Sequence, residues 1–142
     1  MAVGNSEVDV ENLKGAIALG QQVLKSLELA NGGAVVAILT FYGNLAKTSQ
    51  PAAIDRAWIG RALIVFAVGL ALALGAAACA YLGQVTVATA EPDGPLSLAE
   101  RNAYIAPKHR LSNRLLKAAV VVALASLLAF VLGAAFSAVA FA

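Results

Sequence analysis

Few residues of this chain have side chains that could take part in catalysis. The sequence contains one histidine, His109, and one cysteine, Cys79, which has no basic neighbour in sequence to activate its thiol. His109 could form an acid–base pair with an acid such as Glu100, but no nucleophile accompanies it. One histidine and one cysteine are too few for a typical metal site, and GxxxxGKS, HExxH and GxSxG motifs are absent. The sequence therefore predicts a protein that is not an enzyme and that carries no metal or cofactor.

The composition indicates a membrane protein. Of 142 residues, 61% are hydrophobic and 13% are charged, whereas a soluble domain is about half apolar and about a quarter charged. This number of charged residues is too small to cover a water-exposed surface. Much of the chain is therefore expected to be surrounded by membrane lipid. The formal net charge of +2 gives no indication of nucleic-acid binding.

Three uncharged segments are long enough to cross a hydrocarbon core of about 30 Å. The central segment, residues 62–83, would be about 33 Å long as a helix, and the first, residues 29–46, about 27 Å. The third covers residues 118–141. We therefore predict an all-α integral membrane bundle, with a three-span membrane domain over residues 29–142.

Residues 1–28 predict a separate amphipathic helix, because their polar and apolar residues occupy opposite sides at 100° per residue. Such a helix lies either in the membrane interface or with its apolar face against protein, and the sequence leaves both open. Asn31-Gly32-Gly33 follows. It either breaks the helix or remains helical and lets another backbone approach closely; a functional Asn31 amide is the third interpretation.

The segment 84–117 is predicted to be an aqueous loop between the second and third spans. Residues 85–89 are expected to be extended. Ser97 and Glu100 have the spacing of a capping box, which starts a short helix that Pro107 is expected to end.

Small residues recur in the spans, many at intervals of four, a pattern typical of close helix packing in membranes. The predicted packing residues are Gly32, Gly33, Ala67, Ala71, Gly75, Cys79, Gly83, Ala125, Ala129, Gly133 and Ser137.

Two further groups are predicted to lie at the membrane surfaces. Trp58 and Arg61 form an interfacial anchor, with the indole at the level of the headgroups. The second group precedes the third span and is either a site for lipid headgroups or an acidic partner, or an ordinary flank that sets topology. This group consists of Lys108, Arg110, Arg114 and Lys117.

The distribution of basic residues predicts the orientation. Seven of the ten Lys and Arg residues lie in the N-terminal segment or between the second and third spans, which share one side of the membrane. The positive-inside rule then places the N-terminus in the cytoplasm.

The segment LANGGAVVAILTFYGNLA, followed by a span that closes in AYLGQ, resembles small predicted membrane proteins of proteobacteria and their prophages. The resemblance covers mainly residues 28–84. It implies a bacterial inner-membrane protein of three or four helices, and it transfers no functional residue to this chain.

The spans lack Asp, Glu, Lys, Arg and His, which proton relays and ion-coupled carriers use. Their few polar residues are expected to hydrogen-bond between helices or to their own backbone. The leading hypothesis is a small scaffold or accessory subunit that packs against other transmembrane helices, as a homo-oligomer or in a larger complex.

Two alternatives remain open. An oligomeric holin-like or defence-effector protein that permeabilises membranes would need a polar stripe facing water, for which Thr40, Asn44, Ser126 and Ser137 are available. A transporter component for a neutral solute is the other.

Overall fold

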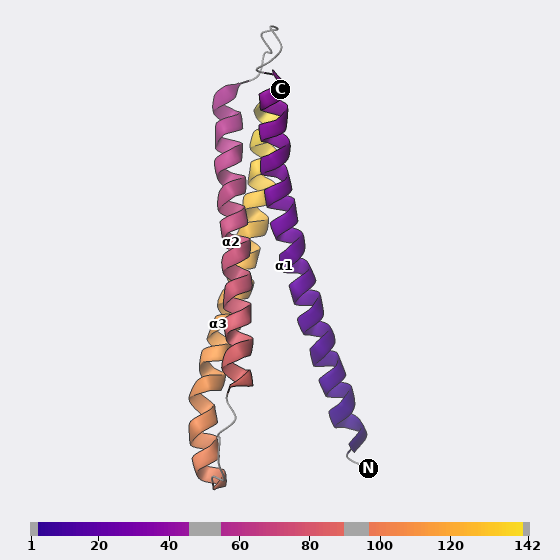
Figure 1. Cartoon of the computed structure of the whole chain (residues 1–142), viewed down its shortest axis with the longest axis vertical. Coiled ribbons are helices and arrows are strands. Elements are labelled where there is room, and N and C mark those ends of the chain that lie inside the picture. The colour runs from indigo at the N-terminus through magenta and orange to yellow at the C-terminus, as the bar shows by residue number, and fades with distance from the viewer. Residues whose placement is uncertain (1–2, 46–54, 90–96, 141–142) are drawn as a thin grey trace.

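The computed structural model describes residues 3–45, 55–89 and 97–140, and it consists of three long helices in this part of the chain. They are α1 (Val3–Leu45), α2 (Arg56–Ala88) and α3 (Leu98–Ala140). α1 and α3 run in one direction and α2 runs in the other, so the start of α1 and the α2–α3 connection lie at the same end (Figure 1). All three helices are long and apolar enough to cross a membrane, which confirms the predicted all-α class.

α2 and α3 pack as an antiparallel pair because each carries a seven-residue repeat of small residues. In α2 the repeat consists of Ala62, Gly69, Ala76 and Gly83, and in α3 of Ser112, Ala119, Ser126, Gly133 and Ala140. All of these residues are buried. A helix has close to 3.5 residues per turn when it coils about a partner, so a repeat of seven keeps the same face on that partner.

Glycines in this repeat allow large side chains to pack directly on a helix backbone. A Cβ atom at Gly133 would lie 2.9 Å from three atoms of the Phe66 ring, closer than side-chain carbons pack. Phe66 is 3% exposed, so its ring has no room to withdraw. A Cβ at Gly83 would lie 3.4 Å from Leu116 Cγ. The pair is therefore closely packed along the length of α2.

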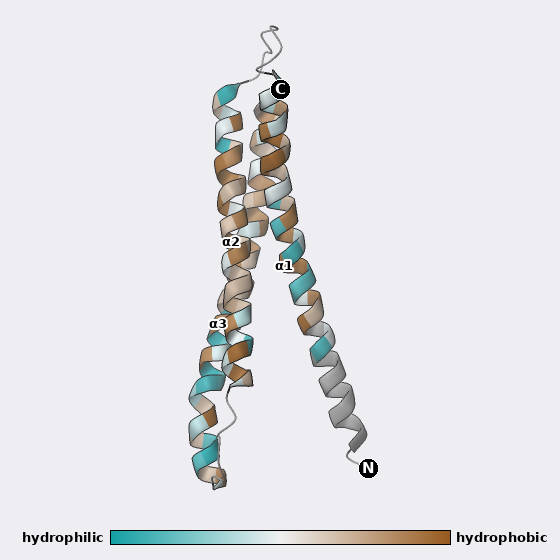
Figure 2. Ribbon diagram, in the orientation of Figure 1, coloured by the Kyte–Doolittle hydropathy of each residue, from teal (hydrophilic) through white to brown (hydrophobic). Residues whose placement is uncertain are grey.

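α1 attaches to this pair over a much smaller area. Among its described side chains only Leu27 and Asn31 are buried, and towards its N-terminus the helix diverges from α2 and α3 (Figure 1). The polar residues gather in the diverging part of α1 and at the starts of α2 and α3, and most of the apolar ones lie between these ends of the bundle (Figure 2).

α1 is continuous through Asn31-Gly32-Gly33, so the interpretation of this triplet as a helix break is wrong. Within Val3–Leu45 the amphipathic segment and the first span are parts of one helix. A Cβ at Gly32 would be 3.8 Å from Leu70 of α2, an ordinary contact distance, whereas a Cβ at Gly33 would meet nothing within 4 Å.

The predicted loop over residues 84–117 is helical at both of its described ends, while residues 90–96 lie outside the described residues. α2 continues to Ala88, so residues 85–88 are helical rather than extended, and α3 passes through Pro107 without ending. Proline removes the hydrogen bond to the carbonyl four residues earlier, and its ring crowds that carbonyl. Here that carbonyl belongs to Ala103, which is exposed, so water can replace the lost bond.

The start of α3 is as predicted. Ser97 donates from both its backbone nitrogen and its hydroxyl to a Glu100 carboxylate oxygen, at 3.0 and 2.6 Å. In return the Glu100 backbone N–H points at Ser97 Oγ, at 3.4 Å, which completes the capping box. These hydrogen bonds, first that from the Ser97 hydroxyl, lower the pKa of Glu100 below its usual value.

Candidate functional site

The two largest fully buried side chains of the described residues meet in one polar contact among the three helices. Asn31 Nδ2 of α1 donates to Ser126 Oγ of α3 at 3.2 Å and to the Leu27 carbonyl of its own helix at 3.0 Å. Ser126 Oγ in turn donates to the Gly69 carbonyl of α2 at 2.8 Å. We call Asn31, Gly69 and Ser126 the polar node.

Only glycine fits at the α2 position of the polar node. A methyl group on Gly69 would collide with the Asn31 carboxamide and would lie 3.2 Å from Ala129 Cβ. Because the Leu27 carbonyl only accepts hydrogen bonds, the Asn31 nitrogen must face it, and Oδ1 is left facing the Gly69 backbone. Within the described part of the chain Oδ1 has no hydrogen-bond partner, and a weak contact with the Gly69 Cα hydrogen is what this geometry offers.

The polar node is suited to joining helices rather than to chemistry. An amide and a hydroxyl neither gain nor lose a proton near neutral pH. Hydrogen bonds between membrane helices contribute about 0.6 kcal/mol each on average. The expectation that intramembrane polar residues bond between helices is confirmed at Asn31 and Ser126. Ser137 instead bonds to the Gly133 carbonyl of its own helix at 2.9 Å.

The predicted packing residues do not share one face. Four residues advance a helix by 400°, so a repeat of four turns by 40° at each step, whereas the observed repeat of seven remains on the partner. Gly83, Ala129 and Gly133 are buried; Gly32, Gly75, Cys79, Ala125 and Ser137 are half-buried; Gly33, Ala67 and Ala71 are exposed. The other members of the seven-residue repeats were not predicted, although their spacing is visible in the sequence.

Trp58 and Arg61 lie together where α2 begins. The Arg61 guanidinium carbon is 4.6 Å above the centre of the Trp58 ring system, and Trp58 in turn contacts the Phe136 ring of α3 at 5.4 Å between centroids. Arg61 is exposed and Trp58 is half-buried. The pair thus has a cation–π contact and an aromatic contact at one end of the bundle.

The predicted basic group divides into two kinds of residue. Lys108 Nζ donates to the Thr89 carbonyl at 2.6 Å and to the Tyr104 hydroxyl at 2.9 Å, and it lies 4.2 Å above the Tyr104 ring. Lys108 therefore caps the C-terminal end of α2, where a positive charge is favourable. Arg110, Arg114 and Lys117 are exposed and form no ion pair with any described residue.

His109 and Glu100 do not meet. They lie nine residues apart on one continuous helix, about 13 Å along its axis and on opposite sides. Within the described ranges no group of three or more His, Cys, Asp or Glu side chains is placed to hold a metal ion.

α1 carries a second notable feature, on the side away from α2 and α3. Four small or polar residues fall within about 60° of one another on the helix surface, at 100° per residue, and all four are exposed. These residues are Gly33, Ala37, Thr40 and Asn44. We call them the α1 stripe.

Comparisons of the chain with protein-family models, with curated proteins and with solved structures find no match. The fold and the polar node alone therefore define the class: an all-helical protein with three helices able to cross a membrane.

Proposed function

We propose that this protein is a small integral membrane scaffold or accessory subunit whose first helix packs against a transmembrane helix of another subunit. The observation that carries the proposal is the α1 stripe. Gly33 and Ala37 would let a second backbone approach closely, and Thr40 and Asn44 would supply hydrogen bonds across the contact.

In the hydrocarbon core of a membrane, the polar side chains of the α1 stripe are unfavourable unless another group covers them. Thr40 and Asn44 are exposed polar residues in a segment of α1 that carries no charge. A polar group in hydrocarbon needs a hydrogen-bond partner, because lipid tails provide none. A neighbouring helix that meets these side chains would remove the cost. The partner is a second copy of the chain or a different subunit.

The pore hypothesis receives less support. Of the four polar residues that could line a pore, Ser126 is fully buried in the polar node and Ser137 is bonded to its own helix. Thr40 and Asn44 share one face of α1. A water-filled pore would therefore require several copies that each contribute the α1 stripe. His109 and Glu100, the predicted acid–base pair, are far apart, so this pair gives no support to a catalytic role.

Site-specific photo-crosslinking in the host membrane tests the proposal. A photoreactive residue at Ala37 should give one reproducible protein adduct, either a dimer or a complex with a second subunit. The same residue at Leu39, which is 53% exposed on a different face of α1, should give mainly lipid adducts. Gly33→Leu should abolish the Ala37 adduct, and Leu39→Ala should not. Lipid adducts alone from both positions would overturn the proposal.

We further propose that the protein lies in a bacterial inner membrane with its N-terminus in the cytoplasm. The end of the bundle that holds the start of α1 and the α2–α3 connection carries Lys14, Arg110, Arg114 and Lys117, which supports this orientation. A reporter that fluoresces only in the cytoplasm should remain dark when it is fused after residue 142. Strong fluorescence of that fusion would reverse the orientation.

A further inference from the structure

Glu28 of α1 lies at a depth where the two neighbouring helices carry no charge. It stands three residues before Asn31, and the hydrogen bond from Asn31 to Ser126 places it level with about residue 123 of α3. Lys117, the nearest charged residue of α3, is about 9 Å from this level along the helix. Residues 62–90 and 118–142 are uncharged. When these runs cross a membrane, Glu28 therefore lies inside the hydrocarbon core.

The Glu28 carboxylate has no partner among the described residues. Glu28 is half-buried and Lys25 is exposed, and neither forms a hydrogen bond or an ion pair with any described residue. Lys25 stands one turn before Glu28 on the same helix, and a lysine that precedes the acid is the less favourable order for an ion pair along a helix. Acids inside a membrane pair with other charged or polar groups, because lipid tails offer no hydrogen bonds. The partner of this carboxylate must therefore come from outside the described residues.

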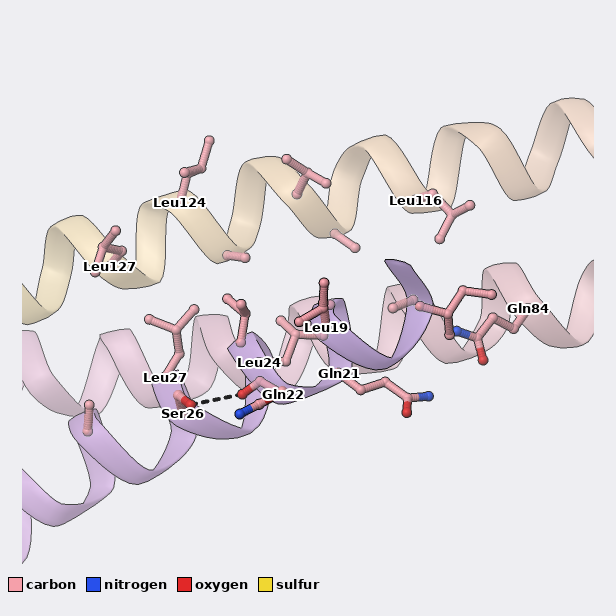
Figure 3. A pocket seen from close by; sticks show the side chains of 18 of the residues that line it. Leu19, Gln21, Gln22, Leu24, Ser26, Leu27, Gln84, Leu116, Leu124 and Leu127 are labelled. Atoms are coloured by element: carbon pink, nitrogen blue, oxygen red, sulfur yellow. Dashed lines mark hydrogen bonds between the residues drawn. The ribbon is translucent and has the colours of Figure 1, made fainter. Parts of the chain in front are cut away.

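Lys25 and Glu28 belong to one polar face of α1. At 100° per residue, Lys14, Gln21, Lys25 and Glu28 fall within an arc of about 60°. Their spacings of seven, four and three residues are those of a face along which two helices coil about each other. Neither Lys25 nor Glu28 lines the apolar groove between α1 and α3. Figure 3 shows Leu24 of α1 directed towards α3 and Gln21 directed away from it.

We propose that α1 pairs along this polar face with α1 of a second copy of the chain, so that each Glu28 binds Lys25 of the other copy. Two copies in one membrane share the same depth. In a parallel pair about a two-fold axis, Lys25 of the second copy is therefore offset from Glu28 by three residues, about 4.5 Å along the helix, which a lysine side chain can span. Two reciprocal ion pairs then provide a partner for every charge of the contact within the membrane.

The charges of this face favour a second copy over a different subunit. The chain itself supplies a base at the required depth, and Gln21 would meet Gln21 of the second copy, where each amide both donates and accepts. Lys14 would also meet its own counterpart. It lies seventeen residues before Asn31, however, beyond the level of Lys117, where water and salt screen the repulsion. The α1 stripe is centred about 120° away around the helix, so this inference does not rest on the proposed function.

Charge exchange between two copies tests the inference in the full-length protein. Glu28→Lys gives a copy with two bases on this face, and Lys25→Glu gives a copy with two acids. Donor and acceptor fluorophores are fused after residue 142 of separate copies, and energy transfer is measured in phosphatidylcholine vesicles. We expect transfer in the unaltered protein, little transfer in either variant alone, and recovery when the basic copy is mixed with the acidic copy.

A milder variant keeps the test decisive if Glu28→Lys does not fold. Glu28→Gln retains the size of the side chain and should weaken self-association by at least about tenfold, as loss of close charge pairs does at other interfaces. Arg114→Gln also removes one charge, from the exposed surface of α3, and should associate like the unaltered protein. Gly33→Leu changes the α1 stripe alone and should leave energy transfer unchanged.

Four results would overturn the inference. The first is an unaltered protein that gives no energy transfer. The second is a mixture of basic and acidic copies that associates no better than each copy alone, as expected if Lys25 pairs with Glu28 of its own helix. The third is a Glu28→Gln variant that associates normally. The fourth is loss of transfer in Gly33→Leu but not in Glu28→Gln, which would move the contact to the α1 stripe and leave the proposed function intact.

Discussion

The contact between α2 and α3 differs in kind from the contact that holds α1. Seven residues of α2 and six of α3 are buried, nearly all of them small, and four of the seven and five of the six belong to the matching seven-residue repeats. Among the described side chains of α1 only Leu27 and Asn31 are buried. The first contact depends on shape along a whole helix, whereas the second depends on one polar node.

This difference has a consequence for how the molecule responds to change. A continuous close-packed interface distributes its free energy over many van der Waals contacts, so a single loss weakens it little. An attachment through one node fails when that node fails. α1 should therefore separate from the α2–α3 pair before the pair itself separates, and this order can be tested by substitution.

Gly69→Ala should have the largest effect, because Gly69 belongs to both contacts. The added methyl group collides with Asn31 and approaches Ala129. Overpacking of this kind lowers the free energy of unfolding by about 1–3 kcal/mol. Unfolding in mixed detergent micelles measures this change in the free energy of unfolding. Gly75→Ala is the matched control on the same helix, since its new methyl group would be 4.0 Å from Val122, and it should be neutral or slightly stabilising. Equal destabilisation by both would show that the contact at Gly69 is not special.

Asn31→Ala and Ser126→Ala should show a smaller, coupled effect. Asn31 and Ser126 share one hydrogen bond, so a double-mutant cycle should give a coupling free energy of about 1 kcal/mol, within the range found between membrane helices. Disulfide trapping between α1 and α3 should decrease in Asn31→Ala, while trapping between α2 and α3 should be unchanged. A coupling near zero would mean that the bond does not hold α1.

The sequence predicted more of the fold than of its contacts. The uncharged runs identify three apolar helices, and Ser97 with Glu100 identifies the start of α3, because length, apolarity and capping are local properties. Pro107 was expected to end a helix, but an exposed turn tolerates the lost hydrogen bond. A break was one of three interpretations of Asn31-Gly32-Gly33, but glycines within a long apolar helix do not require one.

The packing faces were harder to predict. A four-residue repeat was visible from Ala67 to Gly83, yet its first members are exposed and only its last is buried. Which small residues face a partner depends on the coiling of two helices about each other, and the seven-residue spacing of Ala62, Gly69 and Ala76 carries that information. The polar node could not be predicted in full. Asn31 and Ser126 were recognisable as polar residues in apolar runs. They are 95 residues apart in sequence, and their contact depends on how far α1 is shifted along its axis relative to α3.

Lys108→Met should have a modest effect confined to the α2–α3 pair. The substitution removes the hydrogen bonds to the Thr89 carbonyl and the Tyr104 hydroxyl, together with the cation–π contact. We expect a loss of about 0.5 kcal/mol, the value for such contacts at exposed sites. Hydrogen exchange should accelerate over the last turn of α2 and remain unchanged in α1. Arg114→Met is the control, since Arg114 forms no ion pair with the described residues, and acceleration there too would mean that net charge, not the cap, is responsible.

The smallest effect should appear at the start of α3, far from α1, when Glu100 is protonated. Hydrogen bonds from Ser97 lower the pKa of Glu100, so its carboxylate stabilises the first turn fully above the ordinary value of 4.5. That stabilisation should disappear as the pH falls through the lowered pKa. Exchange protection of the first α3 amides, corrected for the intrinsic pH dependence, should therefore decrease in this acidic range. In Glu100→Gln the protection should no longer change with pH, and the α1 attachment should be unaffected in both proteins. A pH-dependent loss that persists in Glu100→Gln would assign the change to a different group.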